Sequence, residues 1–272
     1  MTNASEDRGY LLGDGVFDTL VAFNGKPVEG ERHLARLIAQ AAEIGITVDE
    51  AEIRNDWQEV LFGAADMVTC ILRTTITRGR SGRGLWPSTA SAPTRSVSAT
   101  PWKPDLARNA VSLVTSSVRR NESAPTSRLK SLSYLDNILA AREATERGAD
   151  DALLLNTKGA VACATIANVF ALNGTRLATP PLSDGVLAGT MRALVLELAP
   201  TVGLTVEERT LSPAGFADAD LRFVTNSVRF LRPVSSLDGR RWPPALPTVF
   251  VALRRAVATR VLEATGYRLV WD

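Results

Sequence analysis

The sequence is poor in histidine, the side chain that most often transfers protons and binds metals in enzymes. His33 is its single histidine, which excludes a zinc site built on several histidines and leaves any serine or cysteine nucleophile one imidazole to recruit. The surrounding segment ERHLARL has a helical pattern, which favours a structural or helix-surface role for His33. A lysine, with or without a cofactor, is therefore the leading candidate for a proton carrier, and we expect no metal site.

Cysteines, long apolar runs and an excess of charge of one sign are also lacking. Cys70 and Cys163 are too few for a disulfide framework and are typical of a reducing compartment, so we expect a cytoplasmic protein. No run of about 18 apolar residues occurs, and MTNASEDRGY lacks the features of a signal peptide. The net charge is +2, from 31 basic and 29 acidic residues. Nucleic acid and membrane surfaces are therefore not expected partners.

The length and the hydrophobic content of the chain are typical of a globular protein with a substantial core. The chain has 272 residues and 45% hydrophobic content, enough for one large or two modest domains. A segment rich in proline, serine and threonine, residues 86–104, is typical of an edge strand, loop or linker. We therefore place a boundary near residues 104–108, between a small α/β domain at 1–104 and a large domain at 109–272.

Apolar periodicity and turn dipeptides predict an irregular mixture of strands and helices. The predicted strands are 15–22, 70–77, 111–118, 152–155, 168–172, 176–178 and 221–225. The predicted helices are 31–44, 132–147, 190–199 and 247–264. Asn-Gly or Asp-Gly turns occur at 24–25, 173–174 and 238–239. Because no regular strand–helix–strand alternation appears, the pattern favours an α+β fold with two sheets.

Three features are candidates for binding an anion. Gly189-Thr190-Met191-Arg192 begins a predicted helix, where free backbone N–H groups and the helix dipole favour negative charge, and Thr190 adds a hydroxyl. The polar turn Thr225-Asn226-Ser227 directly follows a strand and can donate from backbone and side chains. Arg36, on the exposed edge of its helix, can supply positive charge. Each is weak alone, because such residues are usually helix caps or solvated side chains; their joint occurrence is the signal.

Lys130 stands just before the predicted helix 132–147 and is followed by a strand, a turn and the segment ANVF at 167–170. Most lysines at a helix entrance are solvated, so position alone gives little reason to assign catalysis to Lys130.

The order and spacing of several blocks nevertheless resemble the class IV aminotransferases over almost the whole chain. The blocks are GDGVFDTL (13–20), ERHLARL (31–37), TRGRSGRG (77–84), KSLSYLDN (130–137), ANVF (167–170), GTMR (189–192) and TNSVRFLRPV (225–234). Together they are specific, although no single block is. The family includes branched-chain and D-amino-acid aminotransferases and 4-amino-4-deoxychorismate lyase.

The resemblance implies a two-domain fold-type-IV enzyme that holds pyridoxal phosphate (PLP) between its domains, with Lys130 binding PLP as a Schiff base. It also implies phosphate contacts from Arg36, Thr190 and the turn of Asn226 and Ser227. Met191 is a further cofactor-binding candidate, and the resemblance implies small-molecule substrates and a homodimer. The substrate is an amino donor with a 2-oxo acid, or an amino-chorismate. The reaction is either transamination or lyase chemistry, and the motifs do not separate the two branches. In D-amino-acid aminotransferases an arginine at the place of Arg83 helps to hold the substrate carboxylate, so Arg83 is a substrate-binding candidate.

Two departures from the family pattern carry consequences. Where relatives have a glutamate that keeps the pyridine nitrogen protonated, this chain has Cys163. A neutral thiol gives little of that effect, so the alternative is a divergent paralogue with lost or altered activity. In addition, only six residues precede Asp7, so we expect the first strand of the family to be short or missing here, leaving a strand edge unpaired.

Overall fold

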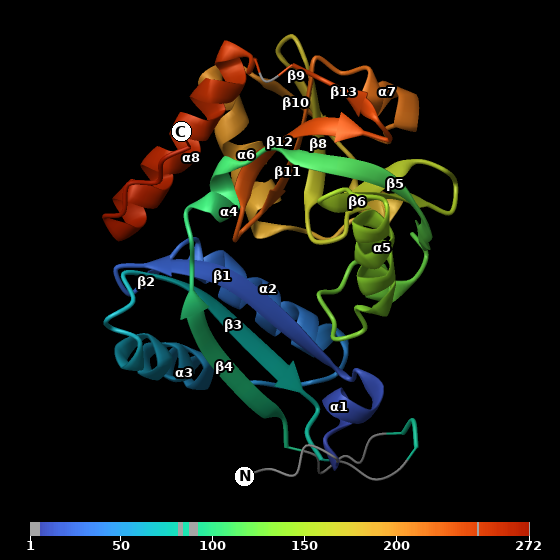
Figure 1. Cartoon of the computed structure of the whole chain (residues 1–272). Coiled ribbons are helices and arrows are strands. Elements are labelled where there is room, and N and C mark those ends of the chain that lie inside the picture. Colours follow the sequence, from blue (N-terminus) through green and yellow to red (C-terminus); the bar gives the residue numbers. More distant parts are fainter. Residues whose placement is uncertain (1–5, 81–83, 87–91, 244, 272) are drawn as a thin grey trace. The chain divides into compact units, whose positions relative to one another are not determined.

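The computed structural model describes residues 6–80, 84–86, 92–243 and 245–271 (Figure 1). The chain forms two compact units. The N-terminal unit comprises Met1–Lys103, Leu129–Tyr134 and Ala264–Tyr267, and the C-terminal unit comprises Pro104–Arg128, Leu135–Glu263 and Arg268–Asp272. The short segments Leu129–Tyr134 and Ala264–Tyr267 thus belong to the N-terminal unit. The predicted domains, 1–104 and 109–272, were continuous and placed both segments in the second domain.

A four-stranded antiparallel sheet forms the centre of the N-terminal unit. Its order is β2 (Lys26–Pro27), β1 (Gly15–Phe23), β3 (Thr69–Thr77) and β4 (Thr94–Pro101). The turn between β1 and β2 places Asn24 at φ 51° and Gly25 at φ 70°, the backbone that an Asn-Gly hairpin turn requires. The edge strand β4 lies within the proline- and serine-rich segment, as the composition indicated.

Helices cover one face of this sheet. They are α2 (Gly30–Glu43), which runs along β1 in Figure 1, and α3 (Glu50–Gly63); the short helix α1 (Arg8–Leu12) precedes the sheet. Apolar residues of α2, α3, β1 and β3 form one core, which includes Leu20, Leu37, Ile53 and Leu72. Alternation along β1 therefore directs Val16, Asp18 and Leu20 toward the helices and Phe17 and Thr19 toward the opposite face. The sequence pattern did not predict α3.

The C-terminal unit contains a nine-stranded mixed sheet. Its main path runs β10-β9-β8-β11-β12-β5-β6-β7, and β13 (Arg240–Arg241) pairs with β12. The strands are β5 (Val111–Arg120), β6 (Asp151–Asn156), β7 (Val161–Ala164), β8 (Asn168–Asn173), β9 (Arg176–Thr179), β10 (Thr205–Glu208), β11 (Leu221–Asn226) and β12 (Phe230–Leu237). The helices are α4 (Asp105–Arg108), α5 (Leu135–Glu146), α6 (Thr190–Leu198), α7 (Pro213–Ala217) and α8 (Thr248–Thr265).

The two sheets confirm the predicted fold class, and the predicted strands and helices are all present. The helix predicted to begin at Leu132 begins instead at Leu135, and its apolar positions Leu135 and Ile138 are 65% and 60% exposed. Its buried residues are Asn137, Ala140 and Ala144. Within the residues that the structure describes, no helix is both long and apolar enough to cross a membrane.

Candidate active site

Three hydrogen bonds fix the backbone of residues 130–132 to the rest of the N-terminal unit. Phe17 N donates to Lys130 O at 2.9 Å, and Leu132 N donates to Gly15 O at 2.9 Å, so residues 130–132 extend the sheet beside β1. Lys130 N donates to the side-chain oxygen of Gln40, on α2, at 3.0 Å. The expectation that Lys130 stands at a helix entrance is therefore wrong, because the residue lies in an extended segment held by a strand and a helix.

Aromatic rings surround the amine of Lys130. Its Nζ lies 4.4 Å from the centroid of the Phe17 ring and 3.4 Å from the hydroxyl of Tyr134. The two rings meet edge to face at 5.0 Å. Burial lowers the pKa of Lys130 to about 8; the carboxylate of Asp18 opposes this shift, and Arg36 and Arg73 add to it. A far larger share of the amine is therefore unprotonated near neutral pH than in a lysine with the ordinary pKa of 10.5, as a nucleophilic lysine requires.

Asp18, His33 and Arg36 form a buried ionic network beside this lysine. Asp18 Oδ1 accepts a hydrogen bond from His33 Nδ1 at 2.5 Å, and Oδ2 accepts from Arg36 Nε at 2.9 Å and Nη2 at 2.6 Å. Burial alone would raise the pKa of Asp18, but the charges of His33 and Arg36 lower it to about 2. Of the two roles expected for His33, structural or on the helix surface, the structure shows the first, because the side chain is buried. The expectation that Arg36 lies on the exposed edge of its helix is corrected, since its side chain is only 12% exposed.

Arg73, on β3, was not among the residues predicted from the sequence. Its guanidinium lies 3.9 Å from the centroid of the Phe17 ring, the ring that Lys130 also contacts. Thr19 on β1 and Ser98 on β4 stand directly opposite Arg73, so hydroxyls flank it on the face of the sheet away from the helices. No carboxylate in the described part of the chain forms an ion pair with Arg73. Arg73 is the one charged residue in the predicted strand CILRTTIT (70–77), and this feature of the sequence could have identified it as a candidate. Arg83, the residue predicted to bind substrate, lies outside the described residues.

In the C-terminal unit, two of the predicted anion-binding segments meet at Asn168. Thr190 is the first residue of α6, and its N-cap, Gly189, makes no side-chain capping hydrogen bond. A Cβ atom at Gly189 would lie 2.0 Å from Asn168 Oδ1, so this close approach requires glycine. Asn168 is also the cross-strand partner of Thr225. The hydroxyls of Thr190 and Thr225 are both buried without a hydrogen-bond partner among the described residues.

The side chains of Met191 and Asn226 are not available to donate hydrogen bonds to an anion. Met191 is buried in the core, which leaves only its backbone N–H, within the first turn of α6, to face an anion. Asn226 Oδ1 accepts hydrogen bonds from Val228 N at 3.0 Å and Arg229 N at 2.7 Å, and its amide donates to Ile166 O at 3.2 Å. The Asn226 side chain therefore builds the turn, and Ser227 carries the turn's hydroxyl.

Cys163 lies in β7, a strand that the sequence pattern did not predict. It pairs with Leu154 and is buried in an apolar cluster with Val114 and Val186. Burial raises the pKa of the Cys163 thiol, Asp151 adds to this effect, and Arg120 opposes it. The thiol is therefore neutral at physiological pH, and the thiolate that could replace a carboxylate is not formed.

Comparison with known proteins decides the family. The profile of Amino-transferase class IV matches residues 15–237. The chain belongs to the class IV aminotransferase family. Over 244 residues it is 32% identical to a D-alanine aminotransferase of Bacillus licheniformis, covering 86% of this chain and 83% of the relative. Over 235 residues it is 30% identical to an aminodeoxychorismate lyase of Bacillus subtilis, covering 85% and 80%.

Solved aminotransferase structures share its fold. A hypothetical aminotransferase from Mycobacterium tuberculosis, solved in a PLP-bound form, has 26% identity and a TM-score of 0.85 and covers 97% of this chain and 94% of its own. The same protein, with alpha-ketoglutarate and PMP bound, gives a TM-score of 0.84 at 26% identity, covering 95% and 93%. The fold-type-IV prediction and the prediction of a family enzyme are thus confirmed.

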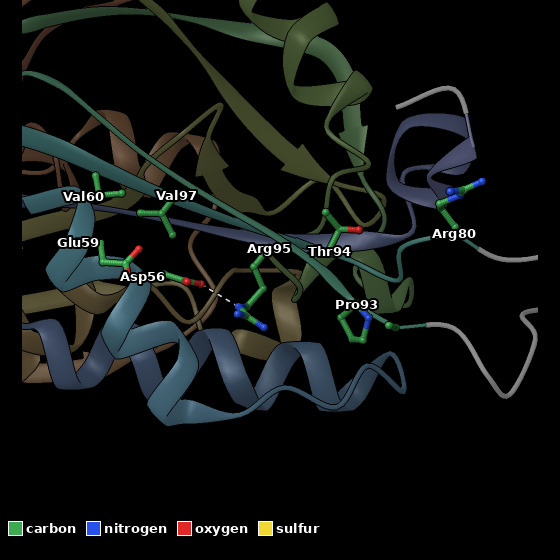
Figure 2. Close-up of a pocket in the computed structure, with 9 residues that line it drawn as sticks. Asp56, Glu59, Val60, Arg80, Pro93, Thr94, Arg95 and Val97 are labelled. Carbon is green, nitrogen blue, oxygen red and sulfur yellow. Dashed lines mark hydrogen bonds and ion pairs between the residues drawn. The ribbon is translucent and has the colours of Figure 1, made fainter. Parts of the chain in front are cut away.

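A separate hollow in this class IV protein lies between α3 and β4 (Figure 2). Its volume is about 540 Å³, and its charged lining includes Asp56 and Arg95, which form an ion pair at 2.7 Å. Arg95 also pairs with Glu52 at 2.5 Å. Because β4 and the Lys130 segment lie at opposite edges of the sheet, this hollow is distinct from the candidate active site.

Proposed function

We propose that this protein is a PLP-dependent enzyme that uses Lys130 as its Schiff-base lysine and transfers the amino group of an amino acid to a 2-oxo acid. The supporting observation is the environment of the Lys130 amine in this class IV chain. The amine lies against Phe17 and Tyr134, and its burial lowers its pKa to about 8. When bound, PLP supplies an aldehyde that condenses with amines and a ring that withdraws electrons from the substrate α-carbon.

The residues present fit the phosphate of PLP. Thr190 and Thr225 each have a buried hydroxyl without a partner in the described ranges, an arrangement that costs stability unless a ligand satisfies it. Thr190 also opens a helix, where backbone N–H groups favour an anion. We assign the phosphate to Thr190, Met191 N–H, and the turn of Asn226 and Ser227. Arg36, on α2 of the N-terminal unit, stays a prediction as a source of positive charge.

Lys130 has a second role in this proposal, as the base at the α-carbon. Once a substrate amine has taken its place, the free Nζ can remove the α-proton and return it at another carbon. A pKa of about 8 suits both steps near neutral pH, since a base is most effective when its pKa is close to the working pH. The hydroxyl of Tyr134, 3.4 Å away, orients Nζ.

Arg73 is our candidate for holding a substrate carboxylate. It shares the Phe17 ring with Lys130, and the hydroxyl residues Thr19 and Ser98 flank it. Planar guanidinium groups recognise carboxylates through paired hydrogen bonds. The M. tuberculosis relative binds alpha-ketoglutarate, which supports a dicarboxylic substrate here. Arg83 remains a second candidate.

A lyase that eliminates after the same α-proton removal is the second candidate function, favoured by the likeness to the B. subtilis aminodeoxychorismate lyase. No observation specifically favours the alternative of lost activity. Pyruvate released from aminodeoxychorismate without an amino acceptor would support the lyase, whereas dependence on a 2-oxo acid would support the transaminase.

The absorption spectrum of the purified protein, with and without added PLP, tests the cofactor assignment. We expect a visible band that Lys130→Ala abolishes and that the control Lys158→Ala, at an exposed residue, retains. Absence of the band in the wild-type protein, or its survival in Lys130→Ala, would contradict the proposal.

We further propose a cytoplasmic homodimer. Both cysteines are free, which suits a reducing compartment. Apolar side chains are exposed on each unit: Tyr10, Leu11, Leu85 and Trp86 on the N-terminal unit, and Leu135 and Ile138 on the C-terminal unit. Exposed apolar groups of this kind often mark protein interfaces. The molar mass in solution, measured by light scattering, tests the dimer.

A further inference from the structure

Phe230 has a backbone conformation that bulky side chains rarely adopt. It is the first residue of β12, and its φ angle is 54°, in the left-handed region. Glycine enters this region without steric cost, whereas a residue with a large side chain stays there only when its surroundings hold it. Strained residues of this kind are common at ligand-binding sites, so both the location and the surroundings of Phe230 are informative.

Phe230 closes the turn between β11 and β12, which is the turn that we assign to the PLP phosphate. It is the cross-strand partner of Asn226. The side-chain oxygen of Asn226 accepts hydrogen bonds from Val228 N at 3.0 Å and Arg229 N at 2.7 Å. Phe230 follows these residues and returns the chain to the sheet. The shape of the turn, and with it the direction of the Ser227 hydroxyl, therefore depends on the left-handed conformation of Phe230.

The ring of Phe230 is held by the C-terminal segment of the same unit. It is fully buried, and the ring of Trp271 meets it edge to face with the centroids 5.9 Å apart. Trp271 Nε1 donates to Arg254 O at 3.3 Å, and the Arg254 guanidinium lies 4.7 Å from the centroid of the Trp271 ring. Arg254 Nη2 also donates to Leu231 O at 2.9 Å, next to Phe230 in the chain. Rotation of Phe230 out of the left-handed region would move its ring out of this packing.

We propose that Phe230 is a positioning residue for the phosphate-binding turn and that Trp271 holds it in the left-handed conformation. This inference rests on the proposed function, which assigns the phosphate to the turn of Asn226 and Ser227. The alternative is a purely structural role, in which the two rings only fill the core. The two roles differ in whether loss of the Trp271 ring changes the turn and its affinity for phosphate.

Trp271→Ala removes the ring that packs against Phe230 and leaves the sequence of the turn intact. The first measurement is hydrogen–deuterium exchange of the peptide that contains Val228 and Arg229, in cofactor-free, full-length protein. The second is the affinity for PLP relative to pyridoxal, which lacks the phosphate. We expect faster exchange in the variant, because the turn opens more often. The preference for PLP should fall by roughly tenfold, since affinity falls with the fraction of molecules in which the turn is correctly formed.

Trp242→Ala is the matched control. Trp242 is also a partly buried tryptophan of the C-terminal unit beside an arginine, with Arg222 Cζ 3.8 Å from the centroid of its ring. It packs against the apolar cluster that includes Phe216 and Val224. Exchange at the turn and the preference for PLP should therefore be the same in Trp242→Ala as in the wild-type protein.

Wild-type exchange and a wild-type preference for PLP in folded Trp271→Ala would overturn the proposal. If circular dichroism shows that this variant is unfolded, Phe230→Gly and Phe230→Ala take its place. Both remove the ring, but glycine tolerates the left-handed region, so Phe230→Gly should keep more of the preference for PLP. Equal preferences in these two variants would overturn the proposal.

The wild-type protein separates this inference from the proposed function. Equal binding of PLP and pyridoxal by the wild-type protein would overturn both the phosphate assignment and the role of Phe230. A wild-type preference for PLP that Trp271→Ala retains in full would overturn the role of Phe230 alone.

Discussion

Gln40 Oε1 accepts a hydrogen bond from the backbone N–H of Lys130 at 3.0 Å, although the two residues are 90 positions apart in the sequence. The bond ties the segment that carries the candidate catalytic lysine to α2, the helix that also carries His33 and Arg36. The side chain of Gln40 is buried, so water does not replace the bond. The position of Lys130 therefore depends on the packing of α2 against β1.

The first prediction is that Gln40→Leu destabilises the protein by about 1–3 kcal/mol, the cost of a buried N–H without a partner. The measurement is the free energy of unfolding in urea. Gln58→Leu, at an exposed position of α3, is the control and should have little effect. Equal stability of the two variants would show that the Lys130 segment does not rely on this bond.

The second prediction concerns pH and Lys130. The pKa of Lys130 is about 8 in the folded protein, whereas the ordinary value of 10.5 applies to the unfolded chain. Between these two pH values the unfolded chain therefore binds more protons than the folded protein. Folding stability contributed by Lys130 therefore rises with pH across this window. Lys130→Met, which removes the titrating group, should be more stable than the wild type at pH 7, and the difference should shrink toward pH 10.5.

Urea unfolding of the cofactor-free protein at several pH values checks this prediction. Lys158→Met reports the effect of replacing an exposed lysine under the same conditions. A Lys130→Met difference that stays constant from pH 7 to pH 10.5 would mean that the amine is not desolvated in the folded protein.

The third prediction is that Thr190→Val weakens PLP binding by roughly tenfold or more, the loss of one hydrogen bond to a charged group. The same change should not destabilise the cofactor-free protein, because the buried hydroxyl has no partner in the described ranges. Equilibrium titration gives the dissociation constant, and thermal unfolding gives the stability. Thr201→Val, at an exposed threonine beyond α6, is the control for binding. Unchanged PLP affinity in Thr190→Val would remove Thr190 from the phosphate site.

Parts of this candidate site could be predicted from the sequence where the residues involved are close together in the chain, and could not where they are far apart. Thr190 and the turn at Asn226 could be predicted as anion-binding candidates because helix starts and polar turns have local signatures. The network of Asp18, His33 and Arg36 was not, since it joins a strand to a helix through side chains that no local pattern relates. The same reason explains why the local structure at Lys130 was predicted wrongly. The apolar spacing predicted a helix from Leu132, but pairing of the neighbouring Ser131 with Val16 on β1 places Lys130 in an extended segment.

The buried face of α5 does not follow its apolar spacing, for a related reason. Its spacing of leucine and isoleucine predicts the helix correctly, but Leu135 and Ile138 are exposed, whereas Asn137 is buried. Asn137 is held inside because its amide donates to Thr165 O at 2.5 Å and its oxygen accepts from Arg120 at 3.3 Å. A pattern of hydrophobicity cannot identify a polar residue whose hydrogen-bond partners are distant in the sequence.

The last prediction tests Cys163, the departure from the family at the place that the resemblance assigns to the pyridine nitrogen. The buried thiol is neutral, because burial raises its pKa, so it provides no negative charge there. Cys163→Glu should accelerate exchange of the substrate α-proton, since an opposite charge favours the protonated ring that withdraws electrons. Cys163→Gln has the same size without the charge and is the matched control.

The exchange is followed by NMR in deuterated water with PLP and an amino acid. Faster exchange in Cys163→Glu than in Cys163→Gln would mean that charge at this position limits proton removal in the natural protein. Equal rates would mean that residue 163 does not act on the ring through charge, and the thiol would then be a small buried side chain of the apolar cluster around Val114 and Leu154. Because both variants enlarge the same buried position, their difference isolates the charge from the packing.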